Sequence, residues 1–247
     1  MTDPYVYEGS SVLKNLLDIT ESRTLDLVEA EQSRANMMLL YEAGFNDFST
    51  PGIQYLHKYL FGDIYEWAGQ FRVINIQKRE KILAGASVWY SNVDSIKEDL
   101  DIVWRKILSI DWPNLTRELF VEQLVNHFPL LWKVHPFREG NTRTIVMMMT
   151  FFIENHGYYV DQELLVASAG YVRNAFVLAA INDYAEREHL KAILLDAIKT
   201  DPIEYTAIDS DDAGEKTSRC TQYQTEDYQP VAHEVRREQY DPEKYRT

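Results

Sequence analysis

Apolar residues recur at helical spacing along most of this chain. In one stretch, Ile53, Leu56 and Leu60 fall on the same side of a helix. Pro51 stands just before them, and proline suits the first turn of a helix because an N–H there has no partner within the helix. Similar patterns with softer boundaries predict further helices over residues 12–17, 24–43, 93–108, 117–131, 141–155, 169–181 and 185–199. We therefore expect a mainly α-helical fold.

The most apolar segment, residues 145–153, is hydrophobic nearly all round. Such a helix is usually buried by other helices on every side, so we expect it at the centre of a helical bundle, ending at Gly157. We interpret its methionines as core packing. The apolar run is too short to cross a bilayer, which takes about 20 residues, and we expect no association with a membrane.

One segment departs from the helical pattern. Residues 71–76 alternate between two faces, as the residues of a strand do. A polar turn over residues 77–81 leads to a second apolar stretch at residues 82–84. The sequence therefore predicts a short β-hairpin in this region.

The composition changes after Thr200. Residues 201–247 hold about twice as many acidic as basic residues and few aliphatic ones. We expect residues 1–200, with a helical lead-in at the N-terminus, to form one domain. Residues 201–247 are expected to form an acidic tail that is partly disordered or lies on the domain.

The net charge of −14 argues against a protein that binds nucleic acid along its phosphate backbone, because such binding needs a basic face. Cys220 is the only cysteine, so an intramolecular disulfide is impossible and a cysteine-based zinc site is not expected. The polar N-terminal residues lack the apolar core of a secretory signal. We expect a cytoplasmic protein, or one that a specialised secretion system delivers into a host cell.

The candidate chemistry lies directly before the central helix, in residues 135–143, which we call the motif segment. Its sequence is HPFREGNTR. His135 precedes a proline, which disfavours helical backbone, and its ring can project into a cleft. An imidazole that is neutral near pH 7 can accept a proton from a hydroxyl. For a lone histidine, the alternative is a ring that only hydrogen-bonds a loop.

The rest of the motif segment suits a phosphate group. The Glu139 carboxylate is a ligand that Mg²⁺ prefers, although an acidic residue near a helix N-terminus also complements the helix dipole. Gly140, Asn141 and Thr142 place small residues where the helix begins, and backbone N–H groups there bind anions. Arg143 can pair with a phosphate through its fork of donors. Together these residues predict a phosphate-binding site at a helix N-terminus.

The motif segment resembles the Fic motif, HPF-x-[D/E]-G-N-x-R. Residues 7–15 are similar to the lead-in of many bacterial Fic proteins, including effectors delivered by type IV secretion. Residues 60–72 are similar to the segment before the family's flap. The resemblance covers about residues 5–199. It implies the Fic fold, a helical bundle around a buried central helix, with a short β-hairpin as the flap.

This resemblance implies transfer of AMP from ATP to a serine, threonine or tyrosine hydroxyl of a target protein, with release of pyrophosphate and with Mg²⁺ as cofactor. His135 would be the general base that activates the hydroxyl, and Glu139 would be the metal ligand. The implied ATP-binding residues are Arg138, Gly140, Asn141, Thr142 and Arg143.

The resemblance also implies which residues lie near the target and the adenine of the nucleotide. The flap residues Ile76, Gln77 and Lys78 would contact the target or the nucleotide. Tyr171 stands where the family often has an aromatic residue near the adenine.

The chain departs from the family pattern in two ways. Many members carry a second arginine, which helps to bind the γ-phosphate, where this chain has Val146. Many are also restrained by a separate helix with the pattern [S/T]-x-x-x-E-[G/N], which this sequence carries nowhere outside the expected central helix. We therefore expect either a toxin or effector restrained by a separate small inhibitor protein, or a different mode of regulation.

Two alternatives stay open at this point. The chain could be a degenerate Fic domain that binds a nucleotide or a partner without catalysis. It could also transfer another phosphate-containing group.

Overall fold

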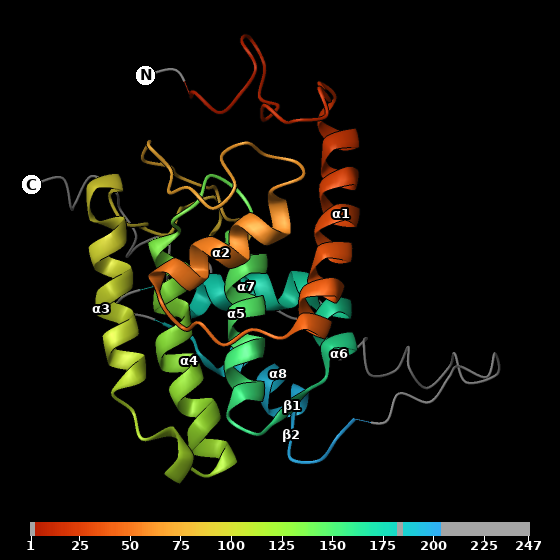
Figure 1. Cartoon of the computed structure of the whole chain (residues 1–247). Helices are drawn as coiled ribbons and strands as arrows, with labels where there is room; N and C mark the ends of the chain where they lie inside the picture. Colours follow the sequence, from red (N-terminus) through yellow and green to blue (C-terminus); the bar gives the residue numbers. More distant parts are fainter. Residues whose placement is uncertain (1–2, 182–184, 204–247) are drawn as a thin grey trace, which may run out of the picture. The chain divides into compact units, whose positions relative to one another are not determined.

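The computed structural model describes residues 3–181 and 185–203, most of which are helical (Figure 1). The helices are α1 (Ser22–Ala43), α2 (Thr50–Phe61), α3 (Ile96–Leu108), α4 (Arg117–Val134), α5 (Asn141–Asn155), α6 (Gln162–Ala167), α7 (Ala169–Ala179) and α8 (Glu188–Ala197). Short 3₁₀ turns are formed by Lys81–Leu83, Val93–Ser95 and Trp112–Asn114. The predicted helical fold is confirmed, and the central helix, α5, has the predicted bounds.

The described residues divide into two compact units. The first unit contains residues 3–76, 90–110 and 134–155. The second unit contains residues 77–89, 111–133, 156–181 and 185–203. The motif segment therefore lies wholly within the first unit.

In the first unit, α2 packs against α1, α3 and α5 (Figure 1). The predicted apolar stripe explains this position, because Ile53, Leu56 and Leu60 are fully buried. The Ser49 hydroxyl accepts a hydrogen bond from the Gly52 N–H at 3.2 Å and so caps the start of the helix. Through α2, helices that are far apart in the sequence are brought to one core.

The motif segment leads directly into α5. Ile145, Met148 and Ile153 of this helix are fully buried, as predicted for the central helix. Gly157 follows the helix with a φ of +85°, the left-handed conformation that commonly ends helices. The motif segment thus stands at the N-terminus of a buried helix.

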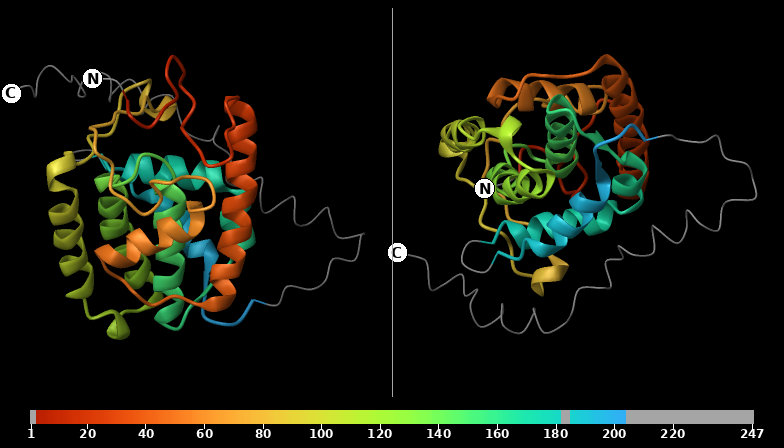
Figure 2. Two further views of the ribbon diagram at one scale, coloured as in Figure 1. Left: turned by 45° about the horizontal axis from the view of Figure 1, so that its top comes forward. Right: turned by 90° about the horizontal axis from the view of Figure 1, so that it is seen from below.

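In the second unit, α7 packs against α6 and α8. A small antiparallel sheet pairs β1 (Tyr159–Val160) with β2 (Ile198–Lys199), with Tyr159 opposite Lys199 (Figure 2). Arg117, at the start of α4, donates from Nε to the Ile198 carbonyl at 3.0 Å. These contacts tie the last described helix back to α4.

The predicted β-hairpin over residues 71–84 is wrong. Residues 71–80 form no strand, and Lys81–Leu83 is a 3₁₀ turn. Side chains take the backbone groups that a hairpin would pair. The Val73 N–H donates to the Tyr5 hydroxyl at 3.0 Å, and the Arg72 guanidinium donates to the Ile74 carbonyl at 2.8 Å.

The predicted helix over residues 12–17 is also wrong. Val6 and Leu13 form an isolated antiparallel bridge instead. The Asn15 side-chain amide donates to the carbonyls of Leu13 and Ile19, at 3.0 and 2.7 Å. Such local side-chain bonds compete with helix formation.

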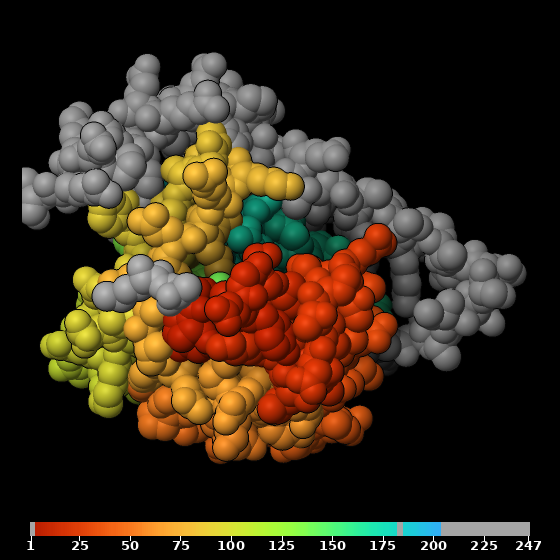
Figure 3. Space-filling model, turned by 90° about the horizontal axis from the view of Figure 1, so that it is seen from above, coloured from red at the N-terminus to blue at the C-terminus, as the bar shows by residue number. Residues whose placement is uncertain are grey.

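The N-terminal segment, residues 3–19, lies against residues 62–73 of the same unit (red in Figure 3). The Leu16 N–H donates to the Ile64 carbonyl at 2.8 Å, and the Tyr5 ring meets the edge of the Trp67 ring at a centroid distance of 5.5 Å. The segment is therefore a packed part of the unit.

No helix within the described ranges is long and apolar enough to cross a membrane. Residues 204–247, which make up most of the predicted acidic tail and include Cys220, lie outside the described residues.

Candidate active site

His135 follows the last residue of α4 and has an uncommon backbone conformation. Its φ of +50° is in the left-handed region, which a non-glycine residue adopts at a cost of about 1–3 kcal/mol. The residue is 2% exposed. The surrounding structure must therefore hold this conformation in place.

Arg72 supplies much of that support. Its Nε donates to the His135 carbonyl at 2.9 Å, and its backbone N–H donates to the Pro136 carbonyl at 2.8 Å. The same guanidinium donates from Nη1 to the Ile74 carbonyl at 2.8 Å and from Nη2 to the Ser91 carbonyl. Arg72 is 2% exposed, and burial lowers its pKa.

The imidazole of His135 is supported from one side by an aromatic ring. Tyr90 stacks on it with a centroid distance of 4.0 Å and an angle of 20° between the planes. The backbone and the ring of His135 are thus positioned by different residues.

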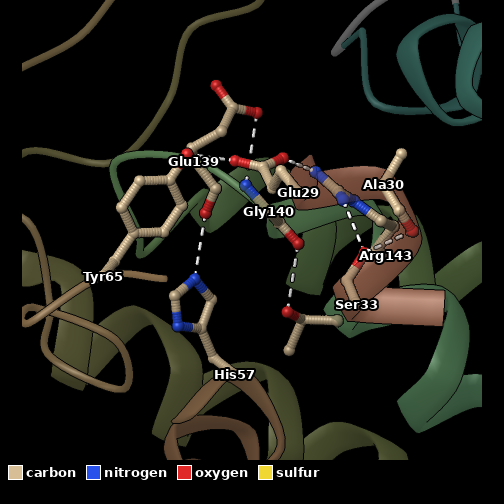
Figure 4. Close-up of polar contacts among 9 residues, drawn as sticks. Glu29, Ala30, Ser33, His57, Tyr65, Glu139, Gly140 and Arg143 are labelled. Atoms are coloured by element: carbon tan, nitrogen blue, oxygen red, sulfur yellow. Dashed lines mark hydrogen bonds and ion pairs between the residues drawn. The ribbon is translucent and has the colours of Figure 1, made fainter. Parts of the chain in front are cut away.

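His57, on α2, supports the next part of the motif segment. The Gly69 N–H donates to its Nδ1 at 2.9 Å, so Nε2 carries the proton and donates to the Glu139 carbonyl at 3.0 Å (Figure 4). The ring stacks on Phe137 at 3.7 Å. Burial lowers the pKa of His57 to about 3, so the ring is neutral at physiological pH.

Gly140 stands at a position that only glycine fits. Its φ is +78°, and a Cβ there would approach the Phe61 ring to 2.5 Å. The Gly140 N–H donates to a carboxylate oxygen of Glu139 at 3.2 Å. The neighbouring Asn141 accepts from the Phe137 N–H at 2.9 Å and donates to the Phe137 carbonyl at 2.8 Å. The Asn141 side chain therefore closes the motif segment on itself.

Arg143, in the first turn of α5, contacts helix α1 (Figure 4). Its Nη1 donates to the Ser33 hydroxyl at 2.8 Å, and its Nη2 forms an ion pair with Glu29. The guanidinium carbon lies 4.8 Å from the centre of the Phe61 ring. The Tyr65 hydroxyl donates to the same Glu29 carboxylate, and burial together with Glu29 raises the pKa of Tyr65.

Sequence reasoning missed Glu29 and Ser33. They are four residues apart on α1, so they lie on one face of the helix, and this spacing is the signal that the sequence offered. Both are buried, at 8% and 1% exposed. Glu29 precedes Ser33, which is the reverse of the order in the pattern [S/T]-x-x-x-E-[G/N].

Arg138 also has a carboxylate partner. Its Nε and Nη2 donate to one oxygen of Asp3, at 3.0 and 2.8 Å. Both side chains are partly exposed. The N-terminal segment thus reaches the motif segment directly.

The structure distributes the predicted site residues over both units. His135, Glu139 and the predicted phosphate-binding residues lie together in the first unit, where Ile76 is also found. Gln77, Lys78 and Tyr171 lie in the second unit. There the Lys78 N–H donates to the Ser87 hydroxyl at 3.2 Å, and the Tyr171 hydroxyl is 3.1 Å from His189 Nδ1.

Glu139 is a candidate metal ligand without a ready-made cluster around it. Among the described residues, no group of three or more His, Cys, Asp or Glu side chains could hold a metal ion. A carboxylate beside a helix N-terminus suits Mg²⁺, which commonly takes one or two carboxylates and completes its shell with phosphate oxygens and water. The donor set therefore fits a Mg²⁺ ion that arrives with a nucleotide.

Comparisons with known proteins show which family the region around the motif segment is similar to. Residues 47–153 match the model of the Fic/DOC family. The chain is 29% identical over 165 residues to the probable protein adenylyltransferase y4lH of Sinorhizobium fredii, covering 66% of this chain and 81% of that protein. It is 28% identical over 187 residues to the protein adenylyltransferase VbhT of Bartonella schoenbuchensis, covering 72% of this chain but only 38% of VbhT.

Solved structures show the same fold. The N-terminal Fic domain of a VirB-translocated effector of Bartonella quintana superposes with a TM-score of 0.67 at 23% identity, over 79% of this chain and 91% of that domain. BepC of Bartonella tribocorum, solved with bound AMPPNP, has a TM-score of 0.67 at 21% identity, over 81% of this chain and 97% of that structure. Residues 47–153 therefore carry the match to the Fic/DOC family model, and the solved structures show that the chain shares the fold.

Proposed function

We propose that this chain is a Fic/DOC protein adenylyltransferase, which transfers AMP from ATP to a hydroxyl side chain of a target protein and releases pyrophosphate. The observation that carries the proposal is the motif segment itself. It places a buried histidine at one end and an arginine in the first turn of a helix at the other, within one compact unit. The names of y4lH and VbhT support the same activity.

In this proposal His135 is the general base. It takes the proton from the target hydroxyl, whose oxygen then attacks the α-phosphorus of ATP. The bond from that phosphorus to the bridging oxygen breaks, and pyrophosphate leaves. A positioned base of this kind contributes about 10²–10⁴-fold to a rate.

The N-terminus of α5 binds the triphosphate in this proposal. Backbone N–H groups of Gly140, Asn141 and Thr142 face the phosphates, and Arg138 and Arg143 pair with them. Glu139 would hold Mg²⁺, and the ion would supply positive charge beside the phosphates. The Gly140 N–H must exchange the Glu139 oxygen for a phosphate oxygen when the nucleotide arrives.

Arg143 must make a similar exchange. Its donors are directed at Glu29 and Ser33, so a phosphate has to displace the Glu29 carboxylate before it can pair with Arg143. A phosphate oxygen replaces a carboxylate oxygen with the same charge and similar geometry. The exchange is therefore chemically matched, and ATP binding competes with the α1 contact.

The direct test is transfer of labelled AMP from ATP in a host-cell lysate with Mg²⁺. We expect labelled proteins with the natural chain and a loss of at least about 100-fold with His135→Ala. His127→Ala removes a half-buried histidine of α4 and serves as the matched control. Labelling that does not depend on His135 would contradict the proposed base.

A second candidate function is nucleotide binding without transfer. It is favoured by Val146, which is half-buried in α5 and provides no cation where many relatives have their second arginine. Calorimetry that detects ATP binding while no lysate protein gains mass would favour this reading. The mass gained by a modified protein also distinguishes AMP from any other phosphate-containing group.

We further propose that the chain acts on target proteins in a cytoplasm, as a toxin or effector, and that a separate small protein restrains it. Expression that arrests bacterial growth, and does so only with His135 intact, would support the toxin role. Capture of a small protein by the tagged chain from its source cells would support a separate inhibitor. Growth unaffected by the active chain would contradict the toxin role.

A further inference from the structure

Residues 77–89 belong to the second unit, whereas the residues before and after them belong to the first. We call the two ends of this loop, Ile74 and Asn75 on one side and Ser91 and Asn92 on the other, the neck. The Asn75 side-chain amide donates to the Asn92 side chain at 2.6 Å. The side-chain oxygen of Asn75 accepts a hydrogen bond from the Val93 N–H at 3.0 Å. The two chain ends of the loop are therefore hydrogen-bonded to each other.

Arg72 spans this neck and reaches His135. One guanidinium donates to Ile74 on the outgoing side, to Ser91 on the returning side and to the carbonyl of His135. The guanidinium is a rigid plane, so a shift of any one acceptor changes the geometry at the other two. The side chain is buried, and water does not readily replace a lost partner.

Tyr90 provides a second link between the neck and His135. It directly precedes Ser91 and stacks on the His135 imidazole. The backbone of His135 is therefore tied to the neck through Arg72, and its ring is tied to the neck through Tyr90. Since His135 has a strained left-handed φ, it depends on such support.

We propose that Arg72 and Tyr90 are positioning residues that make the orientation of His135 depend on the geometry of the neck. The inference rests on the proposed function, in which His135 is the base. A protein segment that binds to the 74–91 loop and shifts its ends would change the position of the base through these two residues. Neither residue needs to touch ATP or the target.

The first test compares Arg72→Lys with Arg105→Lys. The lysine at position 72 keeps the charge but loses the planar fork, so we expect kcat for AMP transfer to fall about 100-fold, with little change in the KM for ATP. Arg105 is an exposed residue on α3 of the same unit, and its replacement should leave kcat unchanged. An unchanged kcat in Arg72→Lys would overturn the inference.

The second test separates stacking from other roles of Tyr90. Tyr90→Ala should lower kcat about 10- to 100-fold, and Tyr90→Phe should recover most of that loss because it keeps the ring. If Tyr90→Phe is as slow as Tyr90→Ala, stacking does not position the base.

A third measurement does not need enzymatic turnover. The histidine NMR signal that disappears in His135→Ala reports the ring directly. Its chemical shift and titration midpoint should change in Arg72→Lys and in Tyr90→Ala, and stay the same in Arg105→Lys. An unmoved signal would overturn the positioning role even if transfer occurs. A moved signal in a chain that transfers nothing would support positioning while the proposed function fails.

Discussion

Arg72 and Arg143 serve opposite ends of the same nine-residue motif segment and differ in what they bind. Arg72 is almost wholly buried and donates to three backbone carbonyls. Arg143 has a third of its side chain exposed and donates to two side chains of α1, Glu29 and Ser33. One arginine is surrounded by main chain, and the other faces groups that can rotate away.

This difference separates permanent support from exchangeable binding. A backbone carbonyl cannot leave its partner unless the chain moves, whereas a carboxylate side chain can change its rotamer. The end of the motif segment that carries His135 therefore moves only if the backbone around Arg72 moves, and the end that carries Arg143 can exchange Glu29 for a phosphate.

The largest expected effect is on stability. Arg72→Leu should lower the free energy of unfolding by about 4 kcal/mol, because one buried and two partly buried carbonyls lose hydrogen bonds to a buried charged donor. Arg143→Leu should cost about 1 kcal/mol, since its ion pair is partly exposed. Urea unfolding of both variants measures this directly. Equal losses of stability in the two variants would contradict the difference between the two arginines.

The next prediction concerns the pH dependence of stability. It tests His57, which, like Arg72, is buried and hydrogen-bonds to the backbone of the motif segment. The folded pKa of about 3 is below the ordinary 6.5, so between these values only the unfolded chain binds a proton here. The stability that neutral His57 provides is complete above pH 6.5. It is lost as the pH falls toward 3, by about 1.4 kcal/mol for each pH unit.

Urea unfolding between pH 7 and 4 measures this loss. The variant His57→Gln should be less stable at pH 7 but should depend less on pH. The control variant is His127→Gln, which replaces a histidine of α4 and keeps His57. It should retain the pH dependence that His57 causes. The same slope in His57→Gln and in the natural chain would contradict the assignment.

The third prediction concerns Arg143, whose partner Glu29 can be exchanged for a phosphate. Glu29→Gln removes the charge that a phosphate must displace from Arg143, so ATP should bind about tenfold more tightly, or about 1.4 kcal/mol. Glu31→Gln, an exposed glutamate on the same helix, should bind ATP as the natural chain does. Calorimetry with ATP decides this. Weaker binding in Glu29→Gln would mean that the carboxylate supports the site.

The smallest expected effect concerns Arg138. Asp3→Asn frees this arginine from a partly exposed ion pair, so ATP affinity should rise only about two- to threefold. The gain should shrink at high salt, because salt screens exposed charges. Calorimetry at two salt concentrations measures it. No gain at low salt would argue that Arg138 does not meet the phosphates.

The sequence was most informative where structure follows from local pattern. Ile53, Leu56 and Leu60 predicted the buried face of α2, and an apolar run predicted α5 as the central helix. Both rest on burial at helical spacing, which is visible in a single segment. The motif segment was likewise recognisable, because its residues are contiguous.

The failures arose from contacts between distant segments. Residues 71–76 have the alternation of a strand. Their backbone groups, however, hydrogen-bond to the side chains of Tyr5 and Arg72 and not to a second strand. Glu29 looked like an ordinary polar residue of α1, and only the packing of α1 against α2 turns it inward. The left-handed φ of His135 has no sequence signal, since proline only disfavours the right-handed helix before it.

The partners of Arg72 have a consequence for how related sequences diverge. Because this arginine binds carbonyls, positions 74 and 91 can drift through many side chains without losing the contact. Glu29 meets Arg143 through its side chain, so most other residues at position 29 would remove that contact. Among homologues, Arg72 and Arg143 should both stay unchanged, because one supports the base and the other must still pair with phosphate, whereas position 29 should vary more freely. An alignment would therefore reveal both arginines and hide the partners that each of them has in this chain.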